Sequence, residues 1–360
     1  MSNPFIDRTI RPEVRAMKAY PVAPPWPGIK LELMEDTHFD PQLPAVELRR
    51  ELGERMAAAA FNRYPDPSAP ALKDMMRKTL GIDAKYEIIL GSGSDEVITI
   101  ISQSILAGGG AVVSLEPSFS VFKNAATAVA GRYVGVSLRA DFTLDVDALL
   151  ATIEREQPKL VWIVYPNNPT GNLYPDADIE RVIKAAPGLV VIDEAYEAFA
   201  GRSWLARLDE FPNLVLMRTL SKIGLAGIRL GYAVGAPDWI NEFNKVRGPF
   251  NVGVLQQIAA EVMLKHFDTL KHHARQMVEQ RDRMFNALQK MPGVTPFPSA
   301  ANFVLARFPD SAKVFDGLKA RGILVRNLSA LHPHMANTLR LSAGTPSEVE
   351  ALLVALDGIL

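Results

Sequence analysis

The chain has 360 residues, more than a single hydrophobic core usually supports, so two domains are expected. Its 39 Lys plus Arg and 40 Asp plus Glu give a net charge of −1, which provides no overall field for binding nucleic acid or an anionic membrane surface. Cysteine is absent, which excludes disulfides and thiolate metal sites and favours a reducing compartment, here expected to be the cytoplasm.

The first segment, residues 1–45, is predicted to be an arm rather than a domain. Six prolines between Ala19 and Pro44 forbid a continuous helix and favour an extended chain lying over a neighbouring surface. A helix is then predicted over Val46–Ala60, where leucine and methionine recur at four-residue spacing. It ends near the turn-rich run Asn62–Pro67.

A large domain over residues 46–246 is predicted from short apolar runs, most of them followed by a polar turn and a helical stretch. Such runs alternating with helices indicate a mainly parallel sheet covered by helices on both faces. They are far shorter than the roughly 20 residues that span a bilayer, so no membrane association is expected. Ligands bind outside the carboxyl ends of such strands. The predicted strands are Glu87–Leu90, Ala111–Leu115, Leu160–Tyr165, Leu189–Ile192 and Leu214–Met217.

The last part, residues 247–360, is predicted to be a smaller α/β domain. A long helical stretch keeps its apolar positions on one face up to Leu288, and a closing amphipathic helix runs from Ser347 to Leu360. The strands predicted between them are Asn302–Ala306, Ile323–Val325 and Thr338–Ser342.

A glycine turn joins the first predicted strand to a helix in Ile88–Glu96. Free backbone N–H groups at a helix start, with small residues that allow close approach, suit a phosphate. Ser94 and Asp95 would border that anion. Ordinary turn geometry explains the same residues equally well.

Two further strand ends carry polar side chains. Asn168 follows the most apolar strand, in Tyr165–Gly171, and its amide could bind a ligand oxygen. A plain loop is the alternative, because Asn, Pro and Gly are ordinary turn residues. Asp193 and Tyr196 follow the next strand, where the competing role of the carboxylate is to cap a helix.

The fourth strand end contains Lys222. Isolated lysines are usually solvated surface charges, but this one follows a buried-looking strand and the two hydroxyl residues Thr219 and Ser221. Arg229 comes seven residues later, about two helical turns, so a helical segment would direct both cations to one side.

Together these four strand ends supply the groups that pyridoxal phosphate chemistry requires. Lys222 provides the amine that condenses with the cofactor aldehyde, and Asp193 pairs with the pyridine nitrogen. Asn168 and Tyr196 would donate to the phenolate oxygen, and Phe119, after another strand, could stack on the ring or be a core aromatic. The predicted phosphate ligands are Ser94, Asp95, Thr219, Ser221 and Arg229.

The motifs GSGSDE, YPNNPTG, DEAY and TLSKIGLAGIRLGY, in this order, resemble the fold-type I aminotransferases over nearly the whole chain. The resemblance implies a large cofactor domain and a small domain completed by the N-terminal arm. It also implies a homodimer with shared active sites, in which Tyr64 of Asn62–Pro67 reaches the partner's cofactor phosphate. No metal is expected, since the six histidines form no HExxH pattern.

Within that family the chain is most similar to enzymes that exchange an amino group between L-histidinol phosphate and 2-oxoglutarate. Such an enzyme must bind a phosphate on one substrate and a carboxylate on the other, which arginine does well. Arg340 matches the family position for that anion, Arg326 is a second candidate, and Tyr20 matches a tyrosine that closes over the substrate. Surface arginines and a packing tyrosine are the alternatives.

The segment Glu35–Asp40 departs from the Asn-Pro-Tyr-Gly-like run of many relatives, which leaves the side-chain specificity open. Three other functions remain possible from the residues. They are an aminotransferase for aromatic amino acids, a pyridoxal phosphate lyase or decarboxylase on the same fold, and a non-catalytic phosphate-binding protein.

Overall fold

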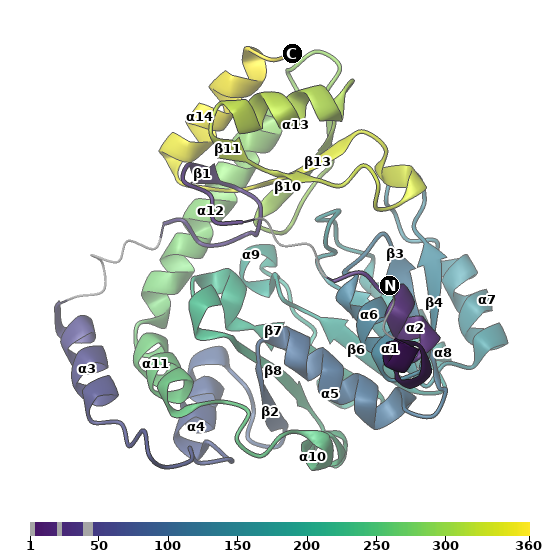
Figure 1. Ribbon diagram of the computed structural model, residues 1–360, viewed down its shortest axis with the longest axis vertical. Helices are drawn as coiled ribbons and strands as arrows, with labels where there is room; N and C mark the ends of the chain where they lie inside the picture. The colour runs from purple at the N-terminus through teal and green to yellow at the C-terminus, as the bar shows by residue number, and fades with distance from the viewer. Residues whose placement is uncertain (1–3, 20–23, 39–45) are drawn as a thin grey trace.

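The structure is a computed structural model that describes residues 4–19, 24–38 and 46–360. Its centre is a seven-stranded sheet with strand order β2-β8-β7-β6-β5-β3-β4 (Figure 1). Strands β4, β3, β5, β6 and β7 are parallel, whereas β8 runs antiparallel to both β7 and β2. The prediction of a mainly parallel sheet is therefore confirmed. The strands are β2 Glu87–Ser92, β3 Ala111–Glu116, β4 Arg132–Ser137, β5 Leu160–Val164, β6 Leu189–Asp193, β7 Leu214–Thr219 and β8 Leu230–Gly235.

Two of these strands, β4 and β8, were not expected from the sequence. Strand β4 lies at the sheet edge and is largely exposed, so it lacks the apolar run that marks a buried strand. Strand β8 is fully buried but contains Gly231 and Gly235, which weaken its β signal. A Cβ at Gly231 would lie 2.3 Å from the backbone nitrogen of Ser94, so close packing against the β2–α5 turn requires glycine there.

Helices cover both faces of the sheet and bury two separate cores. Strand residues alternate between them, so that Ile163 packs in one core while its neighbour Trp162 stacks on Phe122 in the other, with ring centroids 4.5 Å apart. One face carries α4 Pro70–Leu80, α7 Val146–Glu156, α8 Asp176–Ala185 and α11 Val254–Leu264. The other carries α5 Ser94–Leu106, α6 Val121–Ala128 and α10 Pro237–Val246.

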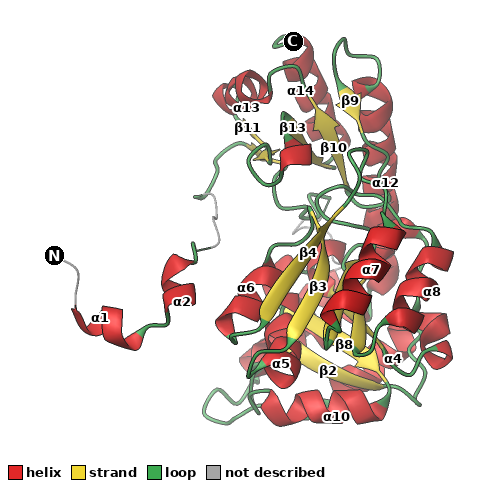
Figure 2. Ribbon diagram, turned by 90° about the vertical axis from the view of Figure 1, so that its right-hand side faces the viewer, coloured by secondary structure: helices red, strands yellow, loops and turns green. Residues whose placement is uncertain are grey.

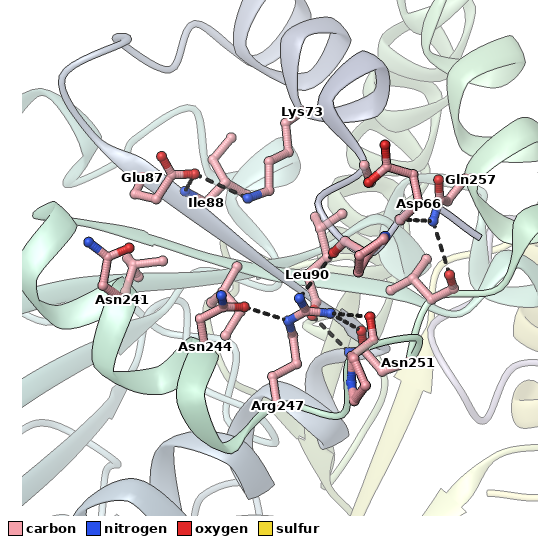
Figure 3. A pocket seen from close by; sticks show the side chains of 16 residues that line it. Asp66, Lys73, Glu87, Ile88, Leu90, Asn241, Asn244, Arg247, Asn251 and Gln257 are labelled. Atoms are coloured by element: carbon pink, nitrogen blue, oxygen red, sulfur yellow. Dashed lines mark hydrogen bonds and ion pairs between the residues drawn. The ribbon is translucent and has the colours of Figure 1, made fainter. Parts of the chain in front are cut away.

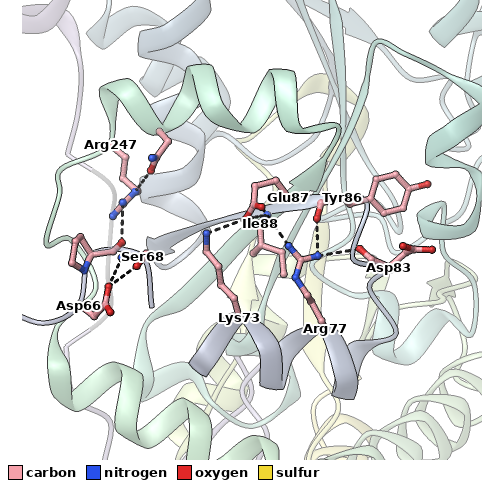
Figure 4. A network of polar contacts seen from close by, with 11 residues as sticks. Asp66, Ser68, Lys73, Arg77, Asp83, Tyr86, Glu87, Ile88 and Arg247 are labelled. Atoms are coloured by element: carbon pink, nitrogen blue, oxygen red, sulfur yellow. Dashed lines mark hydrogen bonds and ion pairs between the residues drawn. The ribbon is translucent and has the colours of Figure 1, made fainter. Parts of the chain in front are cut away.

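A charged cluster joins α4 to the first strand of the sheet (Figure 4). Lys73 donates to Glu87 Oε1 at 3.1 Å, and Arg77 Nη2 lies 3.5 Å from Glu87 Oε2. Arg77 also donates to the Tyr86 carbonyl at 2.6 Å. These contacts attach α4 to the start of β2.

A smaller antiparallel sheet with order β12-β13-β10-β9 lies above the large one in Figure 1. The arm joins this part of the fold, because β1 Ile29–Lys30 pairs in parallel with β11 Ile323–Leu324. A third core lies between these strands and their helices. The elements are β9 Thr295–Pro296, β10 Phe303–Arg307, β12 Arg326–Asn327, β13 Thr338–Ser342, α12 Phe267–Leu288, α13 Ser311–Ala320 and α14 Pro346–Asp357.

The beginning of the chain contains two short helices, α1 Pro4–Thr9 and α2 Pro12–Ala16, which project from the main body (Figure 2). Helix α3 spans Val46–Ala57, three residues shorter than predicted. None of the helices in the described ranges has the length and apolarity needed to cross a membrane. The short helical turns are α9 Glu197–Ala200, η1 Leu205–Glu210, η2 Leu220–Ile223, η3 Ala226–Ile228 and η4 Pro333–Met335.

Candidate active site

A cavity of about 650 Å³ opens at the carboxyl ends of β5, β6 and β7. This is where parallel strands present their following residues to a ligand, and the volume falls within the roughly 300–1,000 Å³ of small-molecule sites. Most of the residues predicted from the sequence line it. They are Ser94, Asp95, Phe119, Asn168, Asp193, Tyr196, Thr219, Ser221, Lys222, Arg229 and Arg340.

An anion cup forms where β2 passes into α5. Gly93 makes the turn with a φ of +82°, and a Cβ there would lie 2.3 Å from Arg229 Nη2. Glycine thus lets the guanidinium approach the free N–H groups at the start of α5, beside Ser94. Arg229 also donates to Asp95 Oδ2 at 3.0 Å, and both side chains are about half exposed. Helix N–H groups and a guanidinium at one place suit a phosphate.

The segment that carries Lys222 is not a continuous helix. It forms two 3₁₀ turns, η2 and η3, separated by Gly224, whose φ is +96°. Thr219 begins η2, and its Oγ1 accepts a hydrogen bond from the Ser221 backbone nitrogen at 3.1 Å. Lys222 and Arg229 nevertheless both line the cavity.

Lys222 lies partly buried at the cavity wall, and its Nζ donates to the Leu33 carbonyl at 3.0 Å. Burial lowers the pKa of Lys222 to about 8, and the positive charge of Arg340 acts in the same direction, opposed by Glu35. A lowered pKa increases the neutral fraction of the amine, which is its nucleophilic form.

Asp193 ends β6 and is 3% exposed. Its Oδ1 accepts a hydrogen bond from the Ala195 backbone nitrogen at 3.0 Å. Burial raises the pKa of Asp193 to about 7, and the nearby charges of Asp95 and Glu194 also raise it. Such a carboxylate favours a positively charged partner, since an opposite charge would stabilise its ionised form.

Three buried polar side chains, Asn168, Tyr196 and Arg340, complete the cavity wall together with Phe119. Arg340 on β13 donates to Asn168 Oδ1 at 2.6 Å and to the Glu32 carbonyl at 2.8 Å. Tyr196 packs edge-on against Phe303, with ring centroids 5.4 Å apart. Phe119 lines the cavity at the end of β3 and contacts Phe122 edge-on. Side chains far apart in sequence thus meet at one place.

Arg326 lies beside this group rather than in the cavity wall. It faces Arg340 across the β12–β13 pair and binds Glu32 Oε1 at 2.5 Å. The Glu32 backbone binds Arg340, so the two arginines share one residue of the arm. Of the two arginines predicted from the sequence, the structure places Arg340 in the cavity wall and Arg326 beside it, and their shared contact with Glu32 was not predicted.

Tyr64 does not line the cavity of its own chain. It is 80% exposed and stacks on Phe250, with ring centroids 4.3 Å apart. The loop that carries it borders a small polar pocket in which Arg247 donates to the Pro67 carbonyl at 3.0 Å (Figure 3). Tyr20 lies outside the described residues.

The resemblance placed the segment from Glu35 at the border of the substrate pocket, but the sequence interpretation did not assign Leu33 and Met34 to the cavity wall. Asn302 Nδ2 donates to the Met34 carbonyl at 3.0 Å, and Met34 in turn donates its N–H to Ser342 Oγ at 3.1 Å. These contacts use backbone atoms, so no side-chain pattern could have revealed them.

Comparison with known sequences gives a consistent result over almost the entire chain. The aminotransferase class I and II family matches residues 36–356. Histidinol-phosphate aminotransferase 1 of Burkholderia mallei is 49% identical over 348 residues, which is 96% of this chain and 97% of that protein. Histidinol-phosphate aminotransferase of Chromobacterium violaceum is 48% identical over 351 residues, 98% of each chain.

Solved structures share the fold. Histidinol-phosphate aminotransferase from Sinorhizobium meliloti, in complex with pyridoxal-5'-phosphate, superposes with a TM-score of 0.84 at 27% identity and covers 98% of this chain and 97% of that one. L-threonine-O-3-phosphate decarboxylase from Porphyromonas gingivalis gives a TM-score of 0.77 at 22% identity, covering 92% and 98%. The second likeness concerns the fold alone.

Proposed function

This chain belongs to the class I and II aminotransferases, and on that premise we propose that it transfers the amino group of L-histidinol phosphate to 2-oxoglutarate, with pyridoxal phosphate as cofactor. The products are imidazole acetol phosphate and L-glutamate. The observation that carries the proposal is the single cavity in which Lys222, Asp193 and Arg340 meet. The high identity to relatives of that name, over nearly their full length, supports the substrate.

The residues of the cavity fit pyridoxal phosphate. The glycine turn at Gly93 leaves room for a phosphate beside Arg229, where a Cβ would collide with the guanidinium. Asp193 is buried at the other side of the cavity with its pKa raised, as expected of a carboxylate that awaits a cationic partner. We propose that the cup binds the phosphate through Ser94, Asp95, Thr219, Ser221 and Arg229.

When bound, the cofactor supplies an aldehyde that condenses with amines and a protonated ring that withdraws electrons from the substrate Cα. Lys222 provides the amine that holds it and then carries the proton between the substrate Cα and the cofactor carbon. Its lowered pKa leaves part of the amine free to accept that proton near neutral pH. Asp193 holds a proton at the pyridine nitrogen.

The remaining side chains orient the two ligands. Asn168 and Tyr196 donate to the cofactor's phenolate oxygen, and Phe119 packs on the ring. Arg340 binds the phosphate of one substrate and the carboxylate of the other, since its planar guanidinium matches both oxyanions. Arg326 supports it through their shared contact with Glu32. Tyr20 closes over the substrate.

We also propose a homodimer in which Tyr64 reaches the cofactor phosphate of the partner. Tyr64 cannot act in its own cavity, because it stacks on Phe250 outside that cavity's lining. Phe61 at 70%, Tyr64 at 80% and Phe250 at 41% exposure form an apolar group that a second copy would cover. The functional units are an arm over residues 1–45, a large domain over 46–246 and a small domain over 247–360. The absence of cysteine suits the cytoplasm as its location.

The test of the reaction uses purified protein loaded with pyridoxal phosphate. L-Histidinol phosphate and 2-oxoglutarate are supplied, and L-glutamate is measured beside a Lys222→Ala control. Glutamate formed only by the wild type supports the proposal. Glutamate formed with phenylalanine but not with histidinol phosphate would move the function to the aromatic amino acids. Release of carbon dioxide without glutamate would indicate a decarboxylase.

The dimer is tested by mixing two inactive variants. In a hybrid of Lys222→Ala and Tyr64→Phe subunits, one of the two sites would combine an intact Lys222 with an intact partner Tyr64. We expect mixing to restore activity that neither parent has. Parents that stay inactive after subunit exchange, verified by mass of the hybrid, would contradict the shared site.

A further inference from the structure

A buried ion pair lies directly behind the strand ends that carry the proposed catalytic groups. Glu194 follows Asp193 at the end of β6, and Arg218 precedes Thr219 at the end of β7. Arg218 Nη2 lies 2.8 Å from Glu194 Oε2, and Arg218 Nε donates to the same oxygen at 2.9 Å. The Glu194 side chain is fully buried, and that of Arg218 is 6% exposed.

The pair and the cavity occupy opposite faces of the sheet. Successive side chains of a strand alternate between faces, and Asp193 and Thr219 line the cavity. Glu194 and Arg218 therefore point away from it. The backbone N–H of Glu194 donates to the Met217 carbonyl at 2.8 Å, which continues the β6–β7 ladder up to the pair. The side-chain pair therefore joins the two strand ends a second time, from the face opposite the cavity.

Both oxygens of the Glu194 carboxylate also accept hydrogen bonds from groups other than Arg218. The Trp204 backbone N–H donates to Oε1 at 2.6 Å, and Ser203 Oγ donates to Oε2 at 3.0 Å. Arg218 Nη2 also donates to Ser203 Oγ at 2.6 Å. The contact between Glu194 and Arg218 is therefore fixed by several hydrogen bonds, and Arg218 Nη1 also lies 3.6 Å from Glu197 Oε1.

Stability alone does not account for such a pair. Burying two charges is costly, and well-packed apolar residues often replace a buried ion pair without loss of stability. The location offers a better reason. Glu194 is adjacent to Asp193, and its negative charge raises the pKa of that carboxyl. Arg218 is the cation paired with Glu194, and its Nη1 also lies 3.6 Å from Glu197 Oε1, so it offsets negative charge next to Asp193.

We propose that Arg218 and Glu194 are positioning residues for the reaction. They hold the ends of β6 and β7 at a fixed spacing, so that Asp193 and Lys222 keep their relative positions, and the positive charge of Arg218 offsets the negative charge of Glu194 beside Asp193. Neither side chain touches the ligand. This inference rests on the proposed pyridoxal phosphate chemistry and names two residues that support it from behind the sheet.

The experiment compares Arg218→Met, Glu194→Gln and the double variant. The matched control is Arg55→Met, which removes an ion pair with Glu261 between α3 and α11, away from the cavity lining. Each apo protein is titrated with pyridoxal phosphate to obtain a dissociation constant. The absorbance of the loaded protein is then followed against pH, and unfolding of the apo protein is followed in urea.

We expect Arg218→Met to weaken cofactor binding about tenfold or more, because it leaves the Glu194 charge unpaired beside Asp193. Loss of a nearby cation should also raise the midpoint of the absorbance titration, by roughly half to one pH unit. The double variant carries neither charge, so its affinity should return to within about threefold of the wild type. Arg55→Met should change neither quantity.

Two results would overturn the inference. One is a double variant that binds the cofactor no better than Arg218→Met, since charge balance would then be irrelevant. The other is a loss of unfolding free energy in all three variants with cofactor affinity and titration midpoint unchanged, which would make the pair purely structural. A wild type that binds no pyridoxal phosphate would instead refute the proposed function itself, and the inference with it.

Discussion

Two pockets, one at the strand ends and one bordered by the Asn62–Pro67 loop, differ in how many hydrogen bonds their cations make to the protein. In the first, about 650 Å³ in volume, Lys222 donates to one described acceptor, the Leu33 carbonyl. In the second, about 80 Å³, Arg247 donates to five, which are Asn244 Oδ1, Asn251 Oδ1 and the carbonyls of Pro67, Gly248 and Pro249 (Figure 3). Burial lowers the pKa of both cations.

Both pockets contain a cation, so the presence of charge does not distinguish them. What differs is whether the hydrogen bonds of the cation are already made to the protein. Arg247 donates from all three of its nitrogens to protein acceptors and joins several segments of the chain, which is a structural role. Lys222 retains an amine with a shifted pKa beside open volume, a combination typical of functional sites. The following predictions test that contrast.

The largest expected effect is on Lys222. We expect Lys222→Ala to lower turnover by at least about 10⁴-fold, because no other group in the cavity lining supplies an amine. Steady-state glutamate formation measures it. Lys73→Ala, in the polar pocket, is the matched control and should stay within about twofold. Comparable losses in both variants would remove the distinction between the pockets.

The next effect concerns the two aspartates. Asp193→Asn keeps the shape of the side chain but cannot hold a proton on the pyridine nitrogen as a carboxylate does, so turnover should fall about 10²–10³-fold. Asp66 in the other pocket accepts hydrogen bonds from Ser68, and Asp66→Asn should leave turnover nearly unchanged. An Asp193→Asn enzyme with wild-type turnover would contradict the role of the carboxylate.

For Arg247 the expected effect is on stability. Arg247→Met leaves three backbone carbonyls without their donor, so the free energy of unfolding should fall by about 2 kcal/mol. Urea denaturation of the apo protein measures this, with Lys222→Met as the comparison. An unfolding free energy that stays at the wild-type value would show that the hydrogen bonds of Arg247 contribute nothing net.

The smallest effect is the pH dependence of apo-protein stability. The pKa of Lys222 is lowered from 10.5 to about 8 by folding. Between these values the unfolded chain binds a proton that the folded chain has released, so the free energy of unfolding rises with pH in this window. Relative to Lys222→Met, the wild type should gain about 1–2 kcal/mol between pH 8 and about pH 9.5 in urea titrations. A difference that stays constant with pH would mean that the pKa of Lys222 is not lowered.

The strand ends were predictable because their signals are local. A strand, a turn and a helix occupy consecutive residues, so the segments around Ser94, Asn168, Asp193 and Lys222 could be located before the fold was known. The edge strand β4 and the glycine-containing β8 were missed because neither has an apolar run. The conformation after Lys222 was also missed, since Gly224 divides two 3₁₀ turns where spacing alone allowed a helix.

The sequence by itself determined which residue types stand at each strand end, and therefore the chemistry that they can perform together. Only the tertiary structure decided their partners: Arg340 with Asn168, Lys222 with the Leu33 carbonyl, and Glu194 with Arg218 behind the sheet. The physical reason is that local backbone preferences act over a few residues, whereas these contacts join segments 24 to 189 residues apart and exist only once the cores have packed.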